Sequence, residues 1–403
     1  MLFKNDSEPE FLQESQGEIV KEEDISISDN NSEISTEIEI EDERDLIDDS
    51  LCGFYDHKES VYCLNMSPVD QDIIVSGGGD DLAYIWRIST KERLCRLAGQ
   101  SFQVLLLGGN RISGHRDSVT VSSFSYDGEY VATGGMDGQI LVWRYKNNGE
   151  LVTSLEGGDE ILWLQWHPKG NILLSGSNDA NVWMWKIPSG DVLQFFSFHK
   201  KPVNAGSFTP DGKKIVTASE DGSLIIWDPK NASIIHKITS SNSRFDCGGL
   251  TCLAYNKEGT VVAVGGITGK VKIISLISGA LLENLDEQKE SIESISYCDV
   301  LPIIACASVD GTVALYDTFT YKLRNVLAHD GAVISLSFIS NTPYLITAST
   351  DRTIRRWDVR TGKCLKQCFG HRDSILCMCS SVDGKTIISG GDDKSILVFK
   401  MTS

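Results

Sequence analysis

The sequence lacks long hydrophobic runs and contains little proline. No apolar stretch approaches the ~18 residues that cross a bilayer, so we expect no transmembrane segment. The opening residues, 1–6, lack the apolar core of a secretory signal. Proline occurs 9 times and glycine 36 times, a balance that favours many short strands joined by tight turns.

Cysteine pairs at metal-binding spacing are also missing. The 11 cysteines are scattered, and none belongs to a CxxC pair. Cys377 and Cys379 form a CxC, which in a strand is more typical of two ordinary strand residues than of a metal site. We therefore expect no metal and reduced thiols in a cytoplasmic protein. The nucleus and a membrane surface stay open as further locations.

Basic residues are scarce at the start of the chain. Residues 1–50 hold 18 acidic and 3 basic side chains, and the whole sequence has a net charge of −19. Because they also lack a sustained apolar period, residues 1–49 are predicted to form a disordered acidic tail. Such a tail either keeps the protein soluble or attracts a basic partner. An acidic protein without a basic stripe repels nucleic-acid phosphate, so we expect a protein partner and no nucleic acid.

Catalytic motifs are absent from the sequence. It has no P-loop, HExxH or GxSxG motif, so we predict a non-enzymatic protein with no catalytic residue, no metal ligand and no cofactor. An enzyme is the competing class, which turnover of a small molecule by the pure protein would reveal. Of the 7 histidines, five belong to the repeat described next, leaving His167 and His236.

What the sequence does contain is a repeat of about 42 residues. A large aromatic residue or its substitute ends each unit, at spacings of 57, 42, 42, 47, 42, 41 and 42 residues. The eight positions are Trp86, Trp143, Trp185, Trp227, Ile274, Tyr316, Trp357 and Phe399. This period matches the ~40–45 residues of one four-stranded propeller blade, so eight blades are predicted.

Further residue columns keep the same register. An aspartate stands six residues before the aromatic in every unit but the fifth, which has Thr268. A serine or threonine stands ten residues before it in six of the units. A histidine opens five units, at His57, His115, His199, His329 and His371. Columns that share one phase are difficult to produce by chance, so the sequence defines the register of the repeat.

These columns resemble the WD-repeat family, whose repeat has Gly-His near its start and Trp-Asp near its end. Both pairs are present, for example Gly114-His115 and Trp357-Asp358. The resemblance covers residues 51–403 and implies an all-β fold, an eight-bladed β-propeller. It also implies that the histidine, Ser/Thr, aspartate and tryptophan of one blade form a buried hydrogen-bonded chain.

Four units carry all members of this chain. The sets are His57, Ser76, Asp80 and Trp86; His115, Thr133, Asp137 and Trp143; His199, Thr217, Asp221 and Trp227; and His329, Thr347, Asp351 and Trp357. Buried polar groups must be hydrogen-bonded, so we expect the members of each set to bond to one another. A Ser-His-Asp constellation that recurs in blade after blade indicates architecture rather than a hydrolase triad.

The last unit ends four residues after Phe399, which is too short for a fourth strand. Residues 50–56 are predicted to supply that strand and to close the ring, because an unpaired edge would promote aggregation. The propeller therefore spans residues 50–403. An extra segment, residues 100–114, interrupts it between the first two units. We interpret this segment as an insert without an evolved role; the alternative is a partner-binding loop, because residues 104–107 are apolar.

The third unit is the most individual part of the repeat. Residues 161–168 and 181–191 hold four of the eight tryptophans. Together with Gly78-Gly79-Asp80-Asp81 and the acidic start, this unit resembles the angio-associated migratory cell protein branch of the family. Fungal members of that branch are chaperones that capture a newly made large-subunit ribosomal protein by its basic N-terminal segment. The resemblance implies a cytoplasmic protein-binding scaffold in ribosome biogenesis, with a role in cell migration and angiogenesis in animals.

Acidic residues gather in the loops beside the histidine and aspartate columns, on one face of the predicted disc. They are Glu59, Asp81, Asp117, Asp159, Glu160, Glu220, Glu290, Asp330, Asp373 and Asp392. Their charges add to a potential with which a monomeric scaffold would hold a basic peptide. The competing interpretation is that these loop acids are simply solvated. Another functional alternative is a substrate receptor of a cullin-type ubiquitin ligase, because Trp357-Asp358-Val359-Arg360 matches the short WDxR motif of such receptors.

Overall fold

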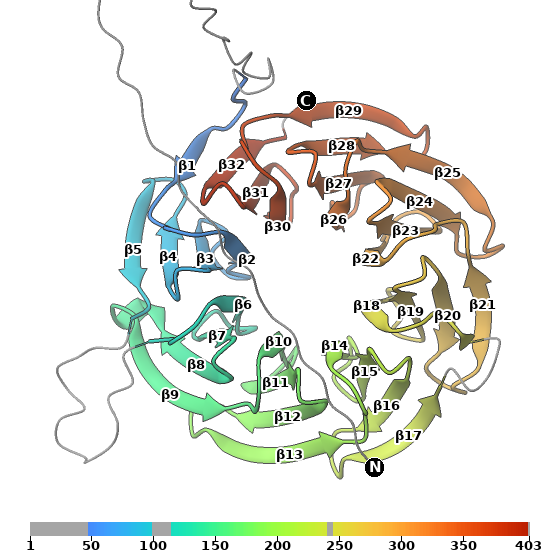
Figure 1. Ribbon diagram of the computed structural model, residues 1–403, viewed down its shortest axis with the longest axis horizontal. Helices are drawn as coiled ribbons and strands as arrows, with labels where there is room; N and C mark the ends of the chain where they lie inside the picture. The colour runs from blue at the N-terminus through green and yellow to red at the C-terminus, as the bar shows by residue number, and fades with distance from the viewer. Residues whose placement is uncertain (1–46, 99–113, 240–244, 402–403) are drawn as a thin grey trace, which may run out of the picture. The chain divides into compact units, whose positions relative to one another are not determined.

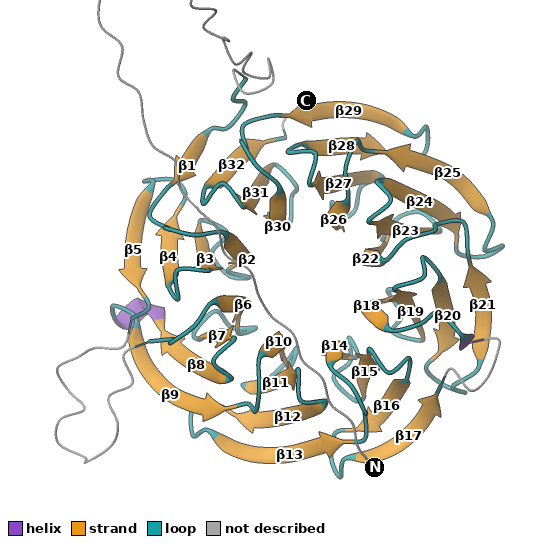
Figure 2. Ribbon diagram, viewed as in Figure 1, coloured by secondary structure: helices purple, strands orange, loops and turns teal. Residues whose placement is uncertain are grey.

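The computed structural model describes residues 47–98, 114–239 and 245–401, which lie within one compact unit of the chain (Figure 1). They form eight four-stranded antiparallel sheets, arranged as blades around a central opening. The eight-bladed propeller predicted from the repeat is therefore confirmed. The described residues form strands and loops, with a short 3₁₀ turn at Tyr145–Asn147 (Figure 2). Residues 1–46 of the predicted tail and 100–113 of the predicted insert lie outside the described residues.

The first four blades follow one another along the chain. Blade 1 contains β2 (Val61–Met66), β3 (Ile73–Gly78), β4 (Ala83–Arg87) and β5 (Glu92–Arg96). Blade 2 contains β6 (Val119–Phe124), β7 (Val131–Gly135), β8 (Gln139–Arg144) and β9 (Glu150–Glu156). Blade 3 contains β10 (Ile161–Trp166), β11 (Ile172–Ser177), β12 (Asn181–Lys186) and β13 (Asp191–Ser197). Blade 4 contains β14 (Val203–Phe208), β15 (Ile215–Ser219), β16 (Leu224–Asp228) and β17 (Ser233–Ile238).

The remaining blades repeat this order, and in each the first strand lines the central opening (Figure 1). Blade 5 contains β18 (Leu250–Tyr255), β19 (Val261–Gly266), β20 (Val271–Ser275) and β21 (Leu281–Leu285). Blade 6 contains β22 (Ile292–Tyr297), β23 (Ile303–Ser308), β24 (Thr312–Asp317) and β25 (Leu323–Ala328). Blade 7 contains β26 (Val333–Phe338), β27 (Tyr344–Ser349), β28 (Ile354–Asp358) and β29 (Lys363–Cys368). Blade 8 contains β30 (Ile375–Ser380), β31 (Thr386–Gly391), β32 (Ile396–Lys400) and β1 (Cys52–Phe54).

The ring closes with a strand from the start of the chain, as the short last unit predicts. β1 pairs antiparallel with β32, with Cys52 opposite Val398 and Phe54 opposite Ile396. Phe54 is buried, and its ring centroid lies 4.6 Å from that of Trp86 in blade 1. The closing strand therefore joins two blades through an apolar contact as well as through its backbone ladder.

Asp-Gly pairs lie at several of the turns between strands. Gly138, Gly222 and Gly311 have φ angles of 71°, 74° and 83°. Glycine adopts this left-handed conformation without the steric cost that a Cβ would add.

The hydrophobic core lies between neighbouring blades, and Trp163 shows how two blades interlock. Its ring lies between Gly176 of its own blade and Gly206 of blade 4. A Cβ atom added to either glycine would come within 2.2 Å of the indole ring. The indole Nε1 donates a hydrogen bond of 2.8 Å to the carbonyl oxygen of Val203. The two glycines therefore leave the space that this tryptophan fills.

Substituting Gly206 by alanine is expected to lower the free energy of unfolding by about 1–3 kcal/mol, because the indole ring must move. Denaturation in urea measures the change. Gly170→Ala is the matched control, since the nearest heavy atom to a Cβ there is 3.7 Å away. The control is expected to change the free energy by less than about 0.5 kcal/mol. Equal effects of the two substitutions would contradict this description of the blade contact.

Candidate functional site

The loops that precede the inner strands lie beside the loops that join the second and third strands of the same blades. In blade 1, the amide of Gly79 donates to the carbonyl of Ser60, at 2.9 Å. In blade 8, the amide of Asp392 donates in the same way to the carbonyl of Ser374. We call the surface formed by these two sets of loops the histidine face, because the histidine column lies directly beneath it.

In blade 1 the predicted chain of polar residues is present inside the blade. The indole Nε1 of Trp86 donates to Ser76 Oγ at 2.9 Å. Ser76 Oγ lies 2.9 Å from His57 Nε2, and His57 Nδ1 lies 2.9 Å from Asp80 Oδ1. A hydroxyl that donates to Nε2 leaves the imidazole proton on Nδ1, where it is donated to the aspartate. The aspartate also accepts the amide of Lys58.

Blades 2 and 7 have the same arrangement. His115 lies 2.8 Å from Thr133 Oγ1 and 3.1 Å from Asp137, and Trp143 donates to the same threonine. His329 lies 2.7 Å from Thr347 Oγ1 and 2.8 Å from Asp351, and Trp357 donates to that threonine. The histidines of these blades are 8% exposed, so they face the blade interior and not a substrate.

Blade 4 differs from the predicted chain. His199 bonds to Thr217 Oγ1 at 2.7 Å, but its Nδ1 bonds to Ser223 Oγ at 2.8 Å. The nearest oxygen of Asp221 is 3.8 Å from Nδ1. Asp221 instead accepts the amides of Lys200 and Ser223, each at 2.8 Å. Asp221 is thus bonded to the loop rather than directly to the histidine, because a serine hydroxyl stands between them.

Blade 8 has a chain that the four complete sets leave out. His371 lies 2.7 Å from Ser389 Oγ and 2.9 Å from Asp393 Oδ2. Phe399 replaces the tryptophan, so only the indole donor is missing. His371 and Asp393 belong to the histidine and aspartate columns of the sequence. They were left out of the complete sets because each of those sets includes a tryptophan.

The geometry explains the acidity of these aspartates. Burial raises the pKa of Asp393, but the hydrogen bonds and charge of His371, with those of Ser395 and the Arg372 amide, outweigh it and lower the pKa to about 2. The pKa of Asp80 is lowered for the same reasons, again against the effect of burial. Each aspartate is therefore a carboxylate that accepts hydrogen bonds from the histidine ring and from loop amides, and the constellation holds loops in place.

The predicted rim acids reach the surface of the histidine face to different extents. Eight of them are exposed, and Asp81 and Glu160 are half-buried. Three already have ion-pair partners: Glu59 with Lys394 at 3.6 Å, Glu220 with Lys201 at 3.0 Å, and Asp330 with Arg355 at 3.4 Å. The rim is therefore not uniformly available to a cation.

Acidic charge is concentrated on blades 1 to 3. We define the acidic sector as Glu59, Asp81, Asp117, Asp159 and Glu160. The described loops of the histidine face in these blades contain only two bases, Lys58 and Arg116. Burial raises the pKa of Asp81, and the neighbouring charges of Asp117, Asp80 and Asp137 raise it further. Carboxylates of different blades are thus close enough to repel one another, and a bound cation would relieve that repulsion.

Basic residues on this face were missed by the sequence analysis. Arginine or lysine follows the histidine directly in four blades, at Lys58, Arg116, Lys200 and Arg372. Lys201 and Lys394 add further positive charge to blades 4 and 8. A count of the lysines and arginines in these loops of the sequence could have found them. That count would have restricted the prediction from ten rim acids to the acidic sector.

The described residues contain no group of three or more His, Cys, Asp and Glu side chains that could hold a metal ion. Burial raises the pKa of Cys379 to about 12 and that of Cys377 well above its usual range. Both side chains are therefore neutral thiols rather than metal-binding thiolates. No helix within the described ranges is long and apolar enough to span a membrane.

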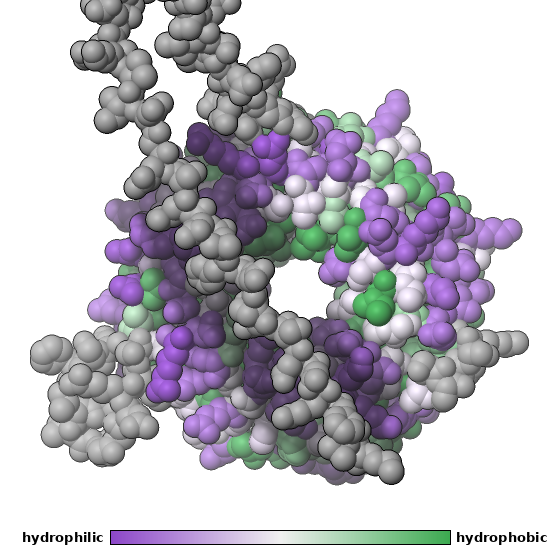
Figure 3. Space-filling view, in the orientation of Figure 1, coloured by the Kyte–Doolittle hydropathy of each residue, from purple (hydrophilic) through white to green (hydrophobic). Residues whose placement is uncertain are grey.

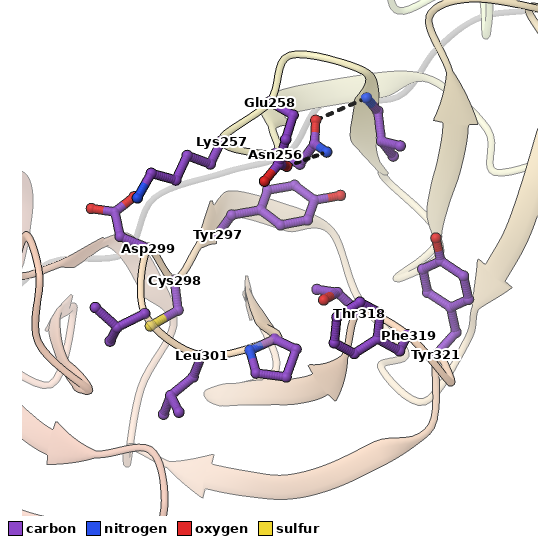
Figure 4. Close-up of a pocket in the computed structure, with 13 residues that line it drawn as sticks. Asn256, Lys257, Glu258, Tyr297, Cys298, Asp299, Leu301, Thr318, Phe319 and Tyr321 are labelled. Carbon is purple, nitrogen blue, oxygen red and sulfur yellow. Dashed lines mark hydrogen bonds between the residues drawn. The ribbon is translucent and has the colours of Figure 1, made fainter.

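A cavity of about 380 Å³ lies on the opposite side of the blades from the histidine face, between blades 5 and 6 (Figure 4). Tyr297, Phe319 and Tyr321 contribute aromatic rings, and Lys257, Glu258 and Asp299 contribute charges. Hydrophilic side chains cover most of the visible propeller surface on the face drawn in Figure 3. Hydrophobic side chains lie at parts of the border of the central opening.

A protein-family model described as "WDR36/Utp21 first beta-propeller" matches residues 147–359. A second, described as "WD domain, G-beta repeat", matches residues 49–87, 109–144 and 362–400. The chain belongs to the WD-repeat family. The resemblance seen in the residue columns is thereby confirmed.

Relatives within the WD-repeat family match nearly the whole chain. An uncharacterized WD repeat-containing protein of Schizosaccharomyces pombe is 42% identical over 95% of this chain and 94% of its own length. The human angio-associated migratory cell protein is 35% identical over 87% of this chain and 80% of its own length. Among solved structures, Chaetomium thermophilum Sqt1 bound to the N-terminus of the ribosomal protein L10 has a TM-score of 0.79. It is 28% identical and covers 88% of this chain and 100% of that chain.

Proposed function

We propose that this WD-repeat protein is a chaperone of ribosome assembly that holds the basic N-terminal segment of a newly made large-subunit ribosomal protein. The single observation that carries the proposal is the acidic sector of the histidine face. Support comes from the similar Sqt1 propeller, whose structure contains the N-terminus of ribosomal protein L10. The protein would act in the cytoplasm as a monomeric scaffold, without cofactor or nucleic acid. A role of the protein in animal cell migration would use the same histidine face.

The physical basis is the summed field of neighbouring carboxylates. Charges held on one rim of a rigid ring add to a potential that attracts a cationic segment and orients it. Asp117 and Asp159 are exposed, and neither forms an ion pair with another described residue. A lysine or arginine of the client would therefore find acceptors that do not have to give up an existing partner.

Reversing Asp117, Asp159 and Glu160 to lysine is expected to weaken binding of a dye-labelled peptide with the L10 N-terminal sequence by about 100-fold or more. Fluorescence anisotropy at several salt concentrations measures the dissociation constant. The salt dependence is expected to decrease together with the affinity, because fewer charge pairs form. Asp81 is left unchanged, since its φ of 62° disfavours a lysine there.

The matched control reverses Glu220, Glu290 and Asp330, which lie on blades 4, 6 and 7. It changes the net charge by the same amount, so a long-range effect of charge alone would affect both variants equally. We expect the control to weaken binding by less than about ten-fold. Thermal melts establish that both variants fold. Equal loss in the two variants, or no loss in the first, would remove the basis of the proposal.

The ligase-receptor alternative depends on Arg360 of the WDxR motif. Arg360 donates from Nε and Nη2 to the carboxylate of Asp358, at 2.9 Å and 2.7 Å. The side chain is nevertheless 53% exposed, and co-purification with the ligase's adaptor that is lost on Arg360→Ala would favour this alternative.

A further inference from the structure

A second cavity lies between blades 3 and 4, on the side away from the histidine face. Its volume is about 340 Å³, within the range of small-ligand sites. The loops that follow β10, β14 and β16 form it, whereas the acidic sector lies on the histidine face of blades 1 to 3. It is therefore separate from the site of the proposed function.

The floor and walls of this cavity are apolar. Met184 and Phe208 form the floor and are 6% and 5% exposed. Ile172 and Pro229 line the walls, together with the ring of His167. His167 stands edge-on to Phe208, with 4.9 Å between ring centroids. An aliphatic or aromatic group of a few carbon atoms would bury its surface here.

The mouth of the cavity is positively charged. Lys213 and Lys230 line it and are exposed, and one acid, Asp228, lies with them. One oxygen of Asp228 accepts the amide of Lys230 at 2.9 Å. Lys213 also forms an exposed ion pair of 3.7 Å with Asp211, which does not line the cavity. The lining side chains thus sum to one positive charge in a protein that is otherwise acidic.

His167 adds a donor to this wall. Its Nδ1 accepts the amide of Lys169 at 3.1 Å, which leaves the proton of the neutral ring on Nε2. Nε2 lies at the edge of the ring beside Gly212, which also lines the cavity. This histidine is one of the two that the repeat does not use.

We propose that this cavity binds the C-terminal residue of a partner peptide, with an apolar side chain on the floor and the terminal carboxylate between Lys213 and Lys230. In a C-terminal residue, the carboxylate and the apolar side chain share one Cα. Both requirements of the cavity are therefore met within a few ångströms. An internal aspartate or glutamate brings the charge without the apolar group. Capture of a terminal carboxylate is a recurring mode of peptide recognition.

The corresponding cavity between blades 5 and 6 provides an internal comparison. It lies at the same position relative to its blades, but its charged residues are Lys257, Glu258 and Asp299. These sum to one negative charge, so a carboxylate is disfavoured there. Shape alone would allow both cavities to bind an apolar residue, whereas charge allows only the one between blades 3 and 4 to bind a C-terminus.

The test compares two dye-labelled peptides of one sequence ending in leucine, one with a free carboxylate and one with a terminal amide. Fluorescence anisotropy with the full chain measures both dissociation constants. Amidation is expected to weaken binding about ten-fold, as is the double substitution Lys213→Glu and Lys230→Glu. Asp228→Asn is expected to tighten binding two- to three-fold, about the effect of one exposed charge. Lys257→Glu, at the other cavity, is the control and should leave binding unchanged.

Other results overturn the proposal. Equal affinity of the acid and the amide would show that no carboxylate is recognised. An amidated peptide with an internal glutamate that binds as well as the free acid would show that the terminus is not the source of the charge. Absence of binding up to about 1 mM peptide would show that the cavity is not a peptide site. Since the acidic sector is untouched in every variant, binding of the L10 peptide should persist throughout, which separates this proposal from the previous one.

Discussion

Removal of residues 1–56 is expected to lower the free energy of unfolding by at least about 3–5 kcal/mol, the usual cost of truncating one buried phenylalanine. The deletion takes away all of β1, including Phe54, which is 3% exposed and contacts Trp86. It also exposes the backbone edge of β32, which pairs with β1 at three positions. Aggregation on heating should increase as well, because a free edge can pair with another chain.

Removal of residues 1–46 is the matched control for this deletion. It keeps β1 and the hydrogen bonds that tie Asp49 to Phe369, which are 2.9 Å long in both directions. Melting temperature and urea midpoint should therefore stay close to those of the full chain. The single substitution Phe54→Ala separates side-chain packing from backbone pairing. If the two deletion variants had the same melting temperature, the closing strand would contribute nothing to the stability of the ring.

The fold could be predicted because its determinants are local and repeated. Each aspartate of the column lies six residues before the aromatic of its own unit. This spacing can be recognised in the sequence without any information about the neighbouring blade. The closing strand could be predicted from the number of strands in the last unit. Phe399 is followed by too few residues to form a fourth strand, and the exposed edge of the third strand needs a partner. Individual strand ends followed from glycines such as Gly138, whose φ of 71° marks a turn.

The site was predicted only in outline, because it depends on relations between blades. Ser223 stands between His199 and Asp221 in three dimensions, yet in sequence it is merely two residues after the aspartate. Which rim acids have partners also depends on distance: Glu59 pairs with Lys394, more than 300 residues away. The cavity beside His167 is formed by loops of two blades, so no single repeat unit contains its pattern.

Substituting Asp351 by alanine is expected to destabilise the protein far more than the same change at Asp310. Asp351 is 3% exposed, and its carboxylate accepts from His329 at 2.8 Å and from Arg355 at 3.0 Å. Losing it leaves the Nδ1 of His329 without its acceptor and leaves Arg355 with only the exposed Asp330 as an anionic partner among the described residues, which costs about 3–5 kcal/mol. Asp310 occupies the same column position in blade 6, but its carboxylate accepts from Thr312 and from the Lys289 amide and has no histidine or arginine partner among the described residues. Its loss should cost about 1–2 kcal/mol.

Acid should narrow the difference in the free energy of unfolding between the wild type and Asp351→Ala. Burial raises the pKa of Asp351, but the hydrogen bonds of His329 and Thr353 outweigh it and hold the pKa well below its usual range. A carboxyl group with a lowered folded-state pKa stabilises the protein fully above its unfolded pKa of about 4. That contribution is lost as the pH falls further, toward the folded-state pKa. Urea denaturation at pH 7 and at pH 3 should thus show a large gap between the two proteins that narrows in acid. A gap independent of pH would mean that the carboxylate charge does not hold the loops of this blade.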